Sequence, residues 1–169
     1  MGWLDGLEAL PKAEWHASHA ATLDQNDPWT HLALGYTAMM SRKTEESISS
    51  FRRALDLNPS SATTHGHFGR ALAFAGREQE AIAHLEEALR LSPYDPQNAT
   101  FETTLAMVHY LAGRFQKAVE FNARALKSRP DYQSAQRSLC ASLAQVGRLN
   151  EAKELLKRIR EHQPNLIYR

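Results

Sequence analysis

The residues best suited to metal chemistry in this chain are its eight histidines. His16 and His19 could share one helix face, but no carboxylate or cysteine accompanies them at the spacing of a metal-ligand set. His65 and His67 are two positions apart, so on a helix they point in different directions. His31 and His65 occupy equivalent positions of the repeat described below, and we interpret them as packing residues. The sequence therefore predicts no metal site and no cofactor.

Other residue patterns that support catalysis are absent from the sequence. It contains no glycine-rich phosphate loop, no nucleophile elbow and no paired carboxylates in a plausible pocket. The single cysteine, Cys140, cannot form an internal disulfide and is predicted to be a small buried side chain. Arg77, Arg114 and Arg148 each follow a glycine and form either a basic ridge or a set of solvated turn residues. We expect a protein that is not an enzyme.

The composition narrows the compartment and the partners. The formal net charge of +1 gives no strong attraction to nucleic acid or to an anionic membrane. No run approaches the ~20 apolar residues that a membrane helix requires, and residues 1–5 lack the basic and apolar regions of a signal peptide. A lone cysteine suits a reducing compartment. We therefore expect a cytoplasmic protein with neither a nucleic-acid nor a membrane partner.

The elements that would position any site follow an internal repeat. A short segment that ends in proline and joins one repeat to the next, called a seam below, recurs along the chain. The prolines are Pro59, Pro93, Pro130 and Pro164, at intervals of 34, 37 and 34 residues. Proline cannot continue a helix, so each seam ends one helix. Between seams stand Gly76, Gly113 and Gly147, and glycine adopts the left-handed conformation that ends helices. Each repeat is thus predicted to be helix, glycine turn, helix, proline turn.

These residues resemble the tetratricopeptide repeat (TPR), a helix–turn–helix of 34 residues. The resemblance rests on apolar–small pairs in first helices and on small residues in second helices, such as Phe68-Gly69 with Ala81 and Ala88. The repeat before these is weaker, because Arg42 replaces the usual glycine and Ser47 the usual alanine. The resemblance implies an all-α fold: an α-solenoid wound as a right-handed superhelix, with four full repeats and an N-terminal partial repeat.

The repeat frame divides the chain into six segments. Within the first of them, Pro11 is expected to open a helix over 12–23, and Ala13, Ala17 and Ala20 take the small and apolar positions of a second helix. Asp27-Pro28 and Asp95-Pro96 are predicted helix starts, and the three extra residues of the longer interval lie in 93–96. The predicted segments are 1–26 (partial repeat), 27–60, 61–96, 97–130 and 131–164 (full repeats) and 165–169 (tail).

In the TPR family the first helix of each pair lines the concave side of the superhelix, which implies a binding groove. The groove predicted here is aromatic and rich in methionine, with two arginines as charged groups, a composition favoured at interfaces. An extended or helical peptide with apolar anchors and a carboxylate would suit it. The other interpretation is that Met39, Met40, Phe74 and Leu111 only pack between neighbouring helices. The predicted partner-binding residues are Trp29, Tyr36, Met39, Met40, Arg70, Phe74, Met107, Tyr110 and Arg137.

Two finer comparisons bear on the partner. Chaperone-binding TPR proteins grip a C-terminal carboxylate with Lys, Asn and Arg from successive first helices, and this clamp is absent here. Its positions hold Leu32, Tyr36, His67, Thr100 and Thr104. The seam at 91–96 with the segment 109–115 resembles bacterial TPR arrays that follow nucleotide-cyclase or winged-helix DNA-binding domains.

Three functions remain open from the sequence. The first is a non-catalytic scaffold that binds a peptide or a partner domain in the concave groove. The second is self-assembly into a homo-oligomer through the apolar ends of the array. The third is a regulatory or sensory role beside a cyclase or transcription-factor domain.

Overall fold

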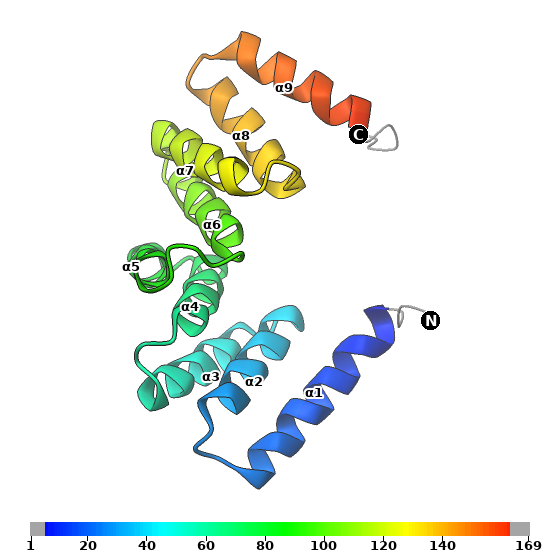
Figure 1. Ribbon diagram of the computed structural model, residues 1–169, viewed down its shortest axis with the longest axis vertical. Helices are drawn as coiled ribbons and strands as arrows, with labels where there is room; N and C mark the ends of the chain where they lie inside the picture. Colours follow the sequence, from blue (N-terminus) through cyan, green and yellow to red (C-terminus); the bar gives the residue numbers. More distant parts are fainter. Residues whose placement is uncertain (1–5, 163–169) are drawn as a thin grey trace. The chain divides into compact units, whose positions relative to one another are not determined.

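The computed structural model describes residues 6–162, and within that range every regular element is an α-helix (Figure 1). The helices are α1 (Gly6–Leu23), α2 (Pro28–Met40), α3 (Thr44–Leu57), α4 (Ala62–Phe74), α5 (Glu78–Leu91), α6 (Asn98–Leu111), α7 (Phe115–Ser128), α8 (Gln133–Gln145) and α9 (Leu149–His162).

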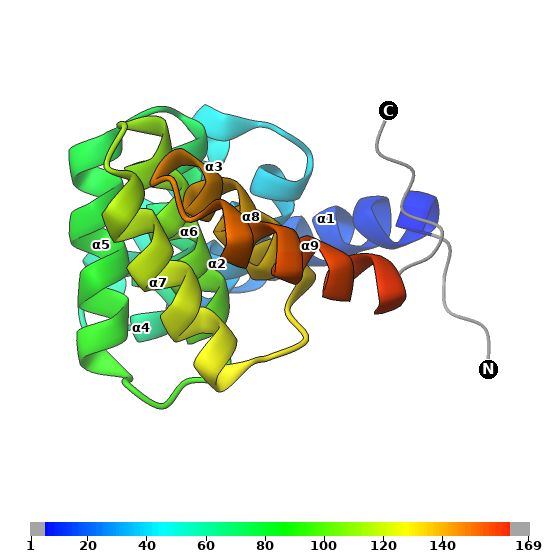
Figure 2. The same ribbon diagram turned by 90° about the horizontal axis from the view of Figure 1, so that it is seen from above.

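The chain divides into two compact units, Met1–Pro93 and Tyr94–Arg169, called unit 1 and unit 2 below. In unit 1, α2 packs with α3 and α4 with α5, while α1 packs on α2. In unit 2, α6 packs with α7 and α8 with α9. Figure 2 shows the same pairs from a second direction. The fold is therefore an all-α solenoid of helix pairs, as the sequence predicts.

The turns inside the helix pairs follow the predicted backbone chemistry. Gly76, Gly113 and Gly147 have φ angles of 73°, 73° and 80°, in the left-handed region that glycine enters without a side-chain penalty. Arg42, which replaces glycine in the first full repeat, has a φ of 60°. The turn geometry is thus kept at that position by a residue that is strained in it.

Helix starts follow the predicted caps in two places and depart in a third. The Asp27 carboxylate accepts hydrogen bonds from the backbone N–H groups of Trp29 and Thr30, and Ser61 Oγ accepts one from Thr64 N. Asp95 accepts one from Gln97 N at 2.8 Å, yet α6 begins only at Asn98. Asp95-Pro96 therefore forms a turn before the helix rather than its first residues.

Small residues allow the paired helices to approach closely. A Cβ atom added at Gly35 would lie 2.6 Å from Cδ1 of the fully buried Phe51. At Gly69 an added Cβ would lie 2.6 Å from Leu85 Cγ and 3.0 Å from the backbone oxygen of Ala81. Ser47, in the usual alanine position, is fully buried and donates a hydrogen bond from Oγ to the Gly35 oxygen at 2.8 Å.

The N-terminal helix differs from the expectation. Pro11 lies inside α1 and does not open a helix, so the predicted start at residue 12 is wrong. The proline removes only the bond to the carbonyl four residues earlier, close to the start of the helix, and the later turns still pack on α2. Ala17 is buried, whereas Ala13 is exposed, although its counterparts in the full repeats are buried.

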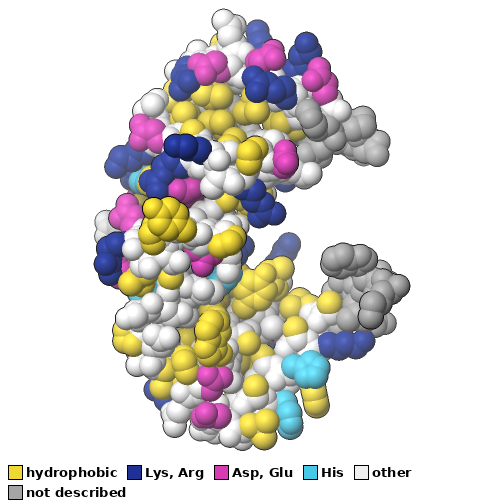
Figure 3. Space-filling model, viewed as in Figure 1, with side chains coloured by type: hydrophobic (Ala, Val, Ile, Leu, Met, Phe, Trp, Pro, Cys, Tyr) yellow, Lys and Arg dark blue, Asp and Glu magenta, His cyan; other side chains and the backbone are white. Residues whose placement is uncertain are grey.

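Apolar contacts hold each unit together. In unit 2, Ala99, Ala125 and Ala135 form one buried cluster, and Val119 forms another with Leu143 and Ala152. On the face shown in Figure 3, hydrophobic side chains also reach the surface over the helices of each unit, among charged ones. No helix in the described part of the chain is long and apolar enough to cross a membrane.

Candidate functional site

A cavity of about 640 Å³ in unit 1 brings together four of the predicted partner-binding residues. They come from the C-terminal half of α2 (Met39, Met40) and from α4 (Arg70, Phe74). The turn between α2 and α3, the first half of α3 and one more residue of α4 complete the wall. The remaining lining residues are Arg42, Thr44, Ser47 and Ala71.

The exposure of these side chains bears on the two interpretations left open by the sequence. Met40 is 52% exposed and Phe74 58%, so neither packs fully between neighbouring helices. Leu111 in α6 is 75% exposed. Met39, at 9%, is buried and supports the cavity wall. Exposed large apolar side chains at the mouth of a cavity are typical of a binding surface.

Arg70 is the charged group whose surroundings are most unusual. Its Nη1 donates to Nδ1 of His67 at 3.3 Å, while its Nε is buried and has no hydrogen-bond partner. His67 is 8% exposed, and the ring of Tyr36 meets it edge-on at 5.1 Å between centroids. The predicted site residues Tyr36 and Arg70 are therefore linked through His67. In the sequence, His67 replaces the asparagine of the chaperone-binding clamp and is not a predicted site residue.

The other predicted site residues lie elsewhere. Trp29, at the start of α2, is 65% exposed and does not line this cavity. Met107 and Tyr110 are half-buried in α6 of unit 2, and the Tyr110 ring packs edge-on against Phe115 at 5.2 Å. Arg137 is exposed on α8.

Unit 2 has a cavity of its own, of about 430 Å³, between α7, α8 and α9. It contains none of the predicted residues. Its lining residues are Leu126, Pro130, Asp131, Gln133, Gln136, Leu155, Arg158 and Ile159. This cavity could not be predicted from the sequence, because these side chains match ordinary positions of the repeat.

Two of the histidines have a role in the seams. His31 Nε2 bonds the Gln25 oxygen at 2.9 Å, and His65 Nε2 bonds the Pro59 oxygen at 3.1 Å. In the equivalent position of unit 2, Gln136 Nε2 donates to the Pro130 oxygen at 2.9 Å. Each bond spans six residues and is called a seam tie below. These residues are therefore more than the packing residues that the sequence predicts.

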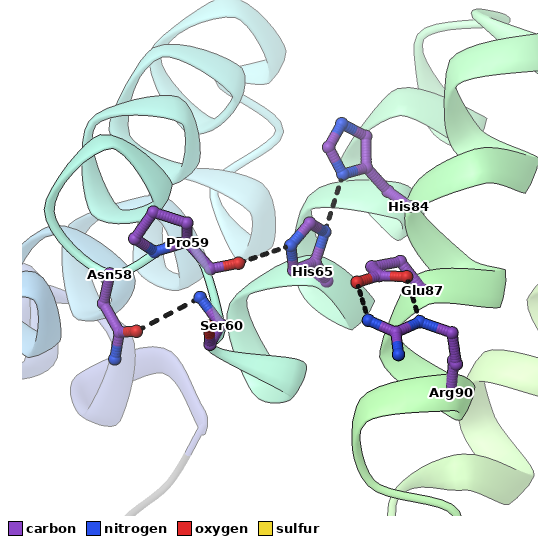
Figure 4. Close-up of polar contacts among 7 residues, drawn as sticks. All are labelled: Asn58, Pro59, Ser60, His65, His84, Glu87 and Arg90. Carbon is purple, nitrogen blue, oxygen red and sulfur yellow. Dashed lines mark hydrogen bonds and ion pairs between the residues drawn. The ribbon is translucent and has the colours of Figure 1, made fainter.

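His65 also meets a second histidine from the paired helix (Figure 4). Its Nδ1 lies 2.9 Å from Nδ1 of His84 on α5. Because the seam tie fixes the proton of His65 on Nε2, His65 Nδ1 accepts and His84 Nδ1 donates. Burial, with His65 as a second cause, lowers the pKa of His84. The pair holds one proton between two nitrogens.

Glu102 takes the seam-tie position in α6 and behaves differently. It is 6% exposed and pairs with Arg124 of α7 at 3.0 Å. Burial raises the pKa of its carboxyl group, and Arg124 only partly opposes this. An ionised carboxylate has no proton to donate to a seam carbonyl. Glu102 is not among the residues predicted from the sequence, although it stands out there as the one acidic residue at the position of His31, His65 and Gln136.

The arginines after the turn glycines have partners within the chain. Arg77 forms a two-point ion pair with Glu80 (2.8 and 2.6 Å), and Arg148 forms one with Glu151 (2.6 Å for both bonds). Arg114 Nε donates to His109 Nδ1 at 2.9 Å. The structure thus favours turn residues over a free basic ridge.

Cys140 is the one cysteine of the sequence and its surroundings make it unreactive. Cys140 is half-buried, less than predicted, and donates from Sγ to the Ala152 oxygen at 3.4 Å. Burial raises the pKa of its thiol, which makes it a weaker nucleophile at neutral pH. Within the described residues, no three His, Cys, Asp or Glu side chains are grouped so as to hold a metal ion.

Comparison with known proteins identifies the repeat. Tetratricopeptide repeat family models match residues 30–61, 60–131 and 112–168. The chain is 34% identical over 116 residues to the transcriptional regulator HilA of Salmonella typhimurium, covering 67% of this chain and 20% of that protein. It is 26% identical over 114 residues to the small glutamine-rich tetratricopeptide repeat-containing protein 2 of Mycosarcoma maydis, 68% of this chain and 32% of that one. The chain therefore spans a fifth to a third of the length of these relatives.

Solved structures show the same fold. MamA has a TM-score of 0.74 at 25% identity, covering 86% of this chain and 83% of its own. PilW, a type IV pilus biogenesis factor, has a TM-score of 0.85 at 21% identity, covering 94% and 72%. YrrB, described as a TPR protein with an unusual peptide-binding site, has 0.72 at 20%, covering 88% and 75%. With the matched residues and the helix pairs together, this chain belongs to the tetratricopeptide repeat family.

Proposed function

We propose that the protein is a non-catalytic interaction module that binds a peptide or a partner domain through the cavity of unit 1. TPR proteins generally mediate protein–protein interactions, and the fold neighbours include a TPR protein with a peptide-binding site. The observation that carries the proposal is the cavity itself, where Met40 and Phe74 are exposed beside Arg70. We place the protein in the cytoplasm, because the lone, half-buried thiol of Cys140 suits a reducing compartment.

The size and chemistry of the cavity support a peptide side chain as its content. Its volume of about 640 Å³ lies within the range of ligand sites, ~300–1,000 Å³. Methionine side chains adapt their shape to different apolar groups. Met39 and Met40 on one side and Phe74 on the other would hold an aliphatic or aromatic anchor, while the neighbouring polar groups bind the peptide beside it.

The test uses exposed residues, so that the variants keep the fold. Peptides selected from a random phage-displayed library on the wild-type protein are measured by fluorescence anisotropy against Met40→Ala/Phe74→Ala and against Leu149→Ala. Leu149 is a matched control because it is 54% exposed but lies on α9 of the other unit. We expect the double variant to lose about tenfold or more in affinity and the control to bind as the wild type does. Unchanged binding by the double variant would exclude this cavity as the site.

A second candidate is a regulatory region of a transcriptional regulator, and it is favoured by the 34% identity to HilA. The two functions are compatible, because a regulator can receive its signal through a bound peptide. In the full-length protein, the test is whether Met40→Ala/Phe74→Ala changes the output of a linked domain. An output that stays unchanged when peptide binding is lost would exclude the regulatory role.

A further inference from the structure

Arg70 has a buried guanidinium nitrogen that lacks a hydrogen-bond acceptor. Nη1 is held by His67, and Nε makes no hydrogen bond. Arg42 lines the same cavity as a second cation, whereas no Asp or Glu among the described residues lines it. A buried donor without an acceptor costs free energy in the unbound protein. An acceptor supplied by a ligand would remove that cost.

The same edge binds carboxylates elsewhere in this protein. Arg77, Arg90 and Arg148 each hold a glutamate with Nε and Nη2 together, at 2.6–2.8 Å. This two-point geometry matches the planar fork of arginine to the two oxygens of a carboxylate. In Arg70 the Nε and Nη2 edge is the one left over by the bond to His67.

We propose that Arg70 binds a carboxylate of the partner peptide, next to an apolar side chain seated between Met40 and Phe74. This inference rests on the proposed function and specifies its ligand: an extended peptide with an acidic group beside an apolar anchor. Nε is covered in the free protein, so the two-point contact forms as the Arg70 side chain turns toward the cavity. Arg42 adds a second positive charge at the same wall.

The site differs from the carboxylate clamp of chaperone-binding TPR proteins. That clamp uses positions that hold Leu32, Tyr36 and His67 in this unit, and Arg70 lies outside them. His67 here acts as a positioning residue, because its Nδ1 accepts a hydrogen bond from Nη1 and so holds the guanidinium group in the unbound protein. Arg70 is therefore the main source of the selectivity for an acidic group in unit 1, and the charge of Arg42 adds to it.

The experiment separates the carboxylate from the apolar anchor. Peptides from the random phage-displayed library are resynthesised with each Asp or Glu replaced by Asn or Gln, and with the C-terminus amidated. Each is titrated against the wild type, Arg70→Gln, Arg70→Lys and the control Arg52→Gln, an exposed arginine of α3. The peptide substitutions leave the protein unchanged, so they remain informative if a variant folds poorly.

The expected result is a loss of about tenfold or more when one particular carboxylate is neutralised on the wild type, the usual effect of a charge-assisted hydrogen bond. Arg70→Gln should bind the acidic and neutral peptides nearly equally, with only the charge of Arg42 left to distinguish them. Arg70→Lys should lie between, and Arg52→Gln should match the wild type. Rising salt should weaken only the acidic peptide.

Other outcomes overturn the inference in distinguishable ways. Selected peptides without an acidic residue that bind Arg70→Gln as tightly as the wild type would refute the carboxylate while leaving the peptide-binding function in place. Selection of no peptide at all would refute both. Self-association of the wild type that Arg70→Gln abolishes, seen by sedimentation, would replace the peptide with a second copy of this chain.

Discussion

The close contact between α4 and α5 predicts the effect of replacing Gly69 by alanine. The added Cβ would lie 2.6 Å from Leu85 Cγ and 3.0 Å from both the Ala81 oxygen and the Leu85 nitrogen. Leu85 is fully buried, and the other two atoms belong to the backbone, so the helices must separate. Gly69 precedes Arg70, so the change acts on the helix that carries the candidate site.

The magnitude follows from two opposing effects. Overpacking a well-filled core costs ~1–3 kcal/mol, and contact with backbone atoms places this case in the upper half of that range. Alanine recovers ~1 kcal/mol over glycine through its helix propensity. We expect a net loss of about 1–2 kcal/mol in the free energy of unfolding, or about 3–6 °C in Tm for a chain of this size.

Tryptophan fluorescence during urea unfolding is a suitable assay. Trp15 and Trp29 lie in unit 1, and the sequence has no tryptophan after residue 29, so the signal does not come from unit 2 and reports on the unit that carries Gly69. Far-UV circular dichroism follows both units. Glu86→Ala, at an exposed position of α5, serves as the control and should change stability by less than ~0.5 kcal/mol.

A double-mutant cycle tests the contact itself. Leu85→Ala alone should cost ~2–5 kcal/mol, but together with Gly69→Ala the loss should be smaller than the sum, because the clash with Cγ is gone. If Gly69→Ala instead stabilises the protein by ~1 kcal/mol, as at an ordinary helix position, that result would contradict the close contact between α4 and α5 at this residue.

Four further predictions follow from single side chains. Arg42→Gly should raise stability by about 0.5–1 kcal/mol in urea unfolding, because glycine fits the φ of 60° without strain; an unchanged or lower midpoint would contradict this. Ser61→Ala should lose about 1 kcal/mol through the missing cap, whereas the neighbouring Ser60→Ala should be neutral. The raised pKa of Glu102 means that the folded state binds its proton more tightly, so wild-type stability gains from Glu102 as pH falls from neutral, and urea midpoints should show a smaller gain in Glu102→Gln. The lowered pKa of His84 has the opposite sign: its contribution is complete above the unfolded value near 6.5 and is lost as pH falls below it, and His84→Gln should remove that loss between pH 7 and 5.

Local chemistry explains what the sequence could predict. The left-handed turns at Gly76, Gly113 and Gly147 and the caps at Asp27 and Ser61 depend only on residues near in sequence. The helix pairs then follow from the period. The prediction that Pro11 opens a helix is wrong because a proline near the start of a helix costs only a single hydrogen bond. The packing of α1 on α2 outweighs that loss.

The candidate site was predictable only in part. Met40, Arg70 and Phe74 share a cavity because the first helices of successive repeats face the same way, which the repeat frame contains. The bond from Arg70 to His67 depends on rotamers, and the pair of His65 and His84 joins two helices across 19 residues. The spacing of three residues allows the first bond but does not determine it, and the second joins helices that no local pattern brings together, so neither could be predicted from spacing alone.

The seam ties have a consequence for how the length of this chain can change. His31, His65 and Gln136 each bind a carbonyl oxygen six residues earlier, which fixes the number of residues that fit between the helices. Glu102, at the same position of the repeat, forms an ion pair with Arg124 instead. The seam before it is the one that is three residues longer than the others. Where Glu102 stands in place of a His or Gln donor, the connection can lengthen at small entropic cost, ~0.6 kcal/mol for each doubling. For protein engineering, the segment 93–96 is thus the natural place to graft a reporter or a foreign loop, while the other seams should resist such insertions.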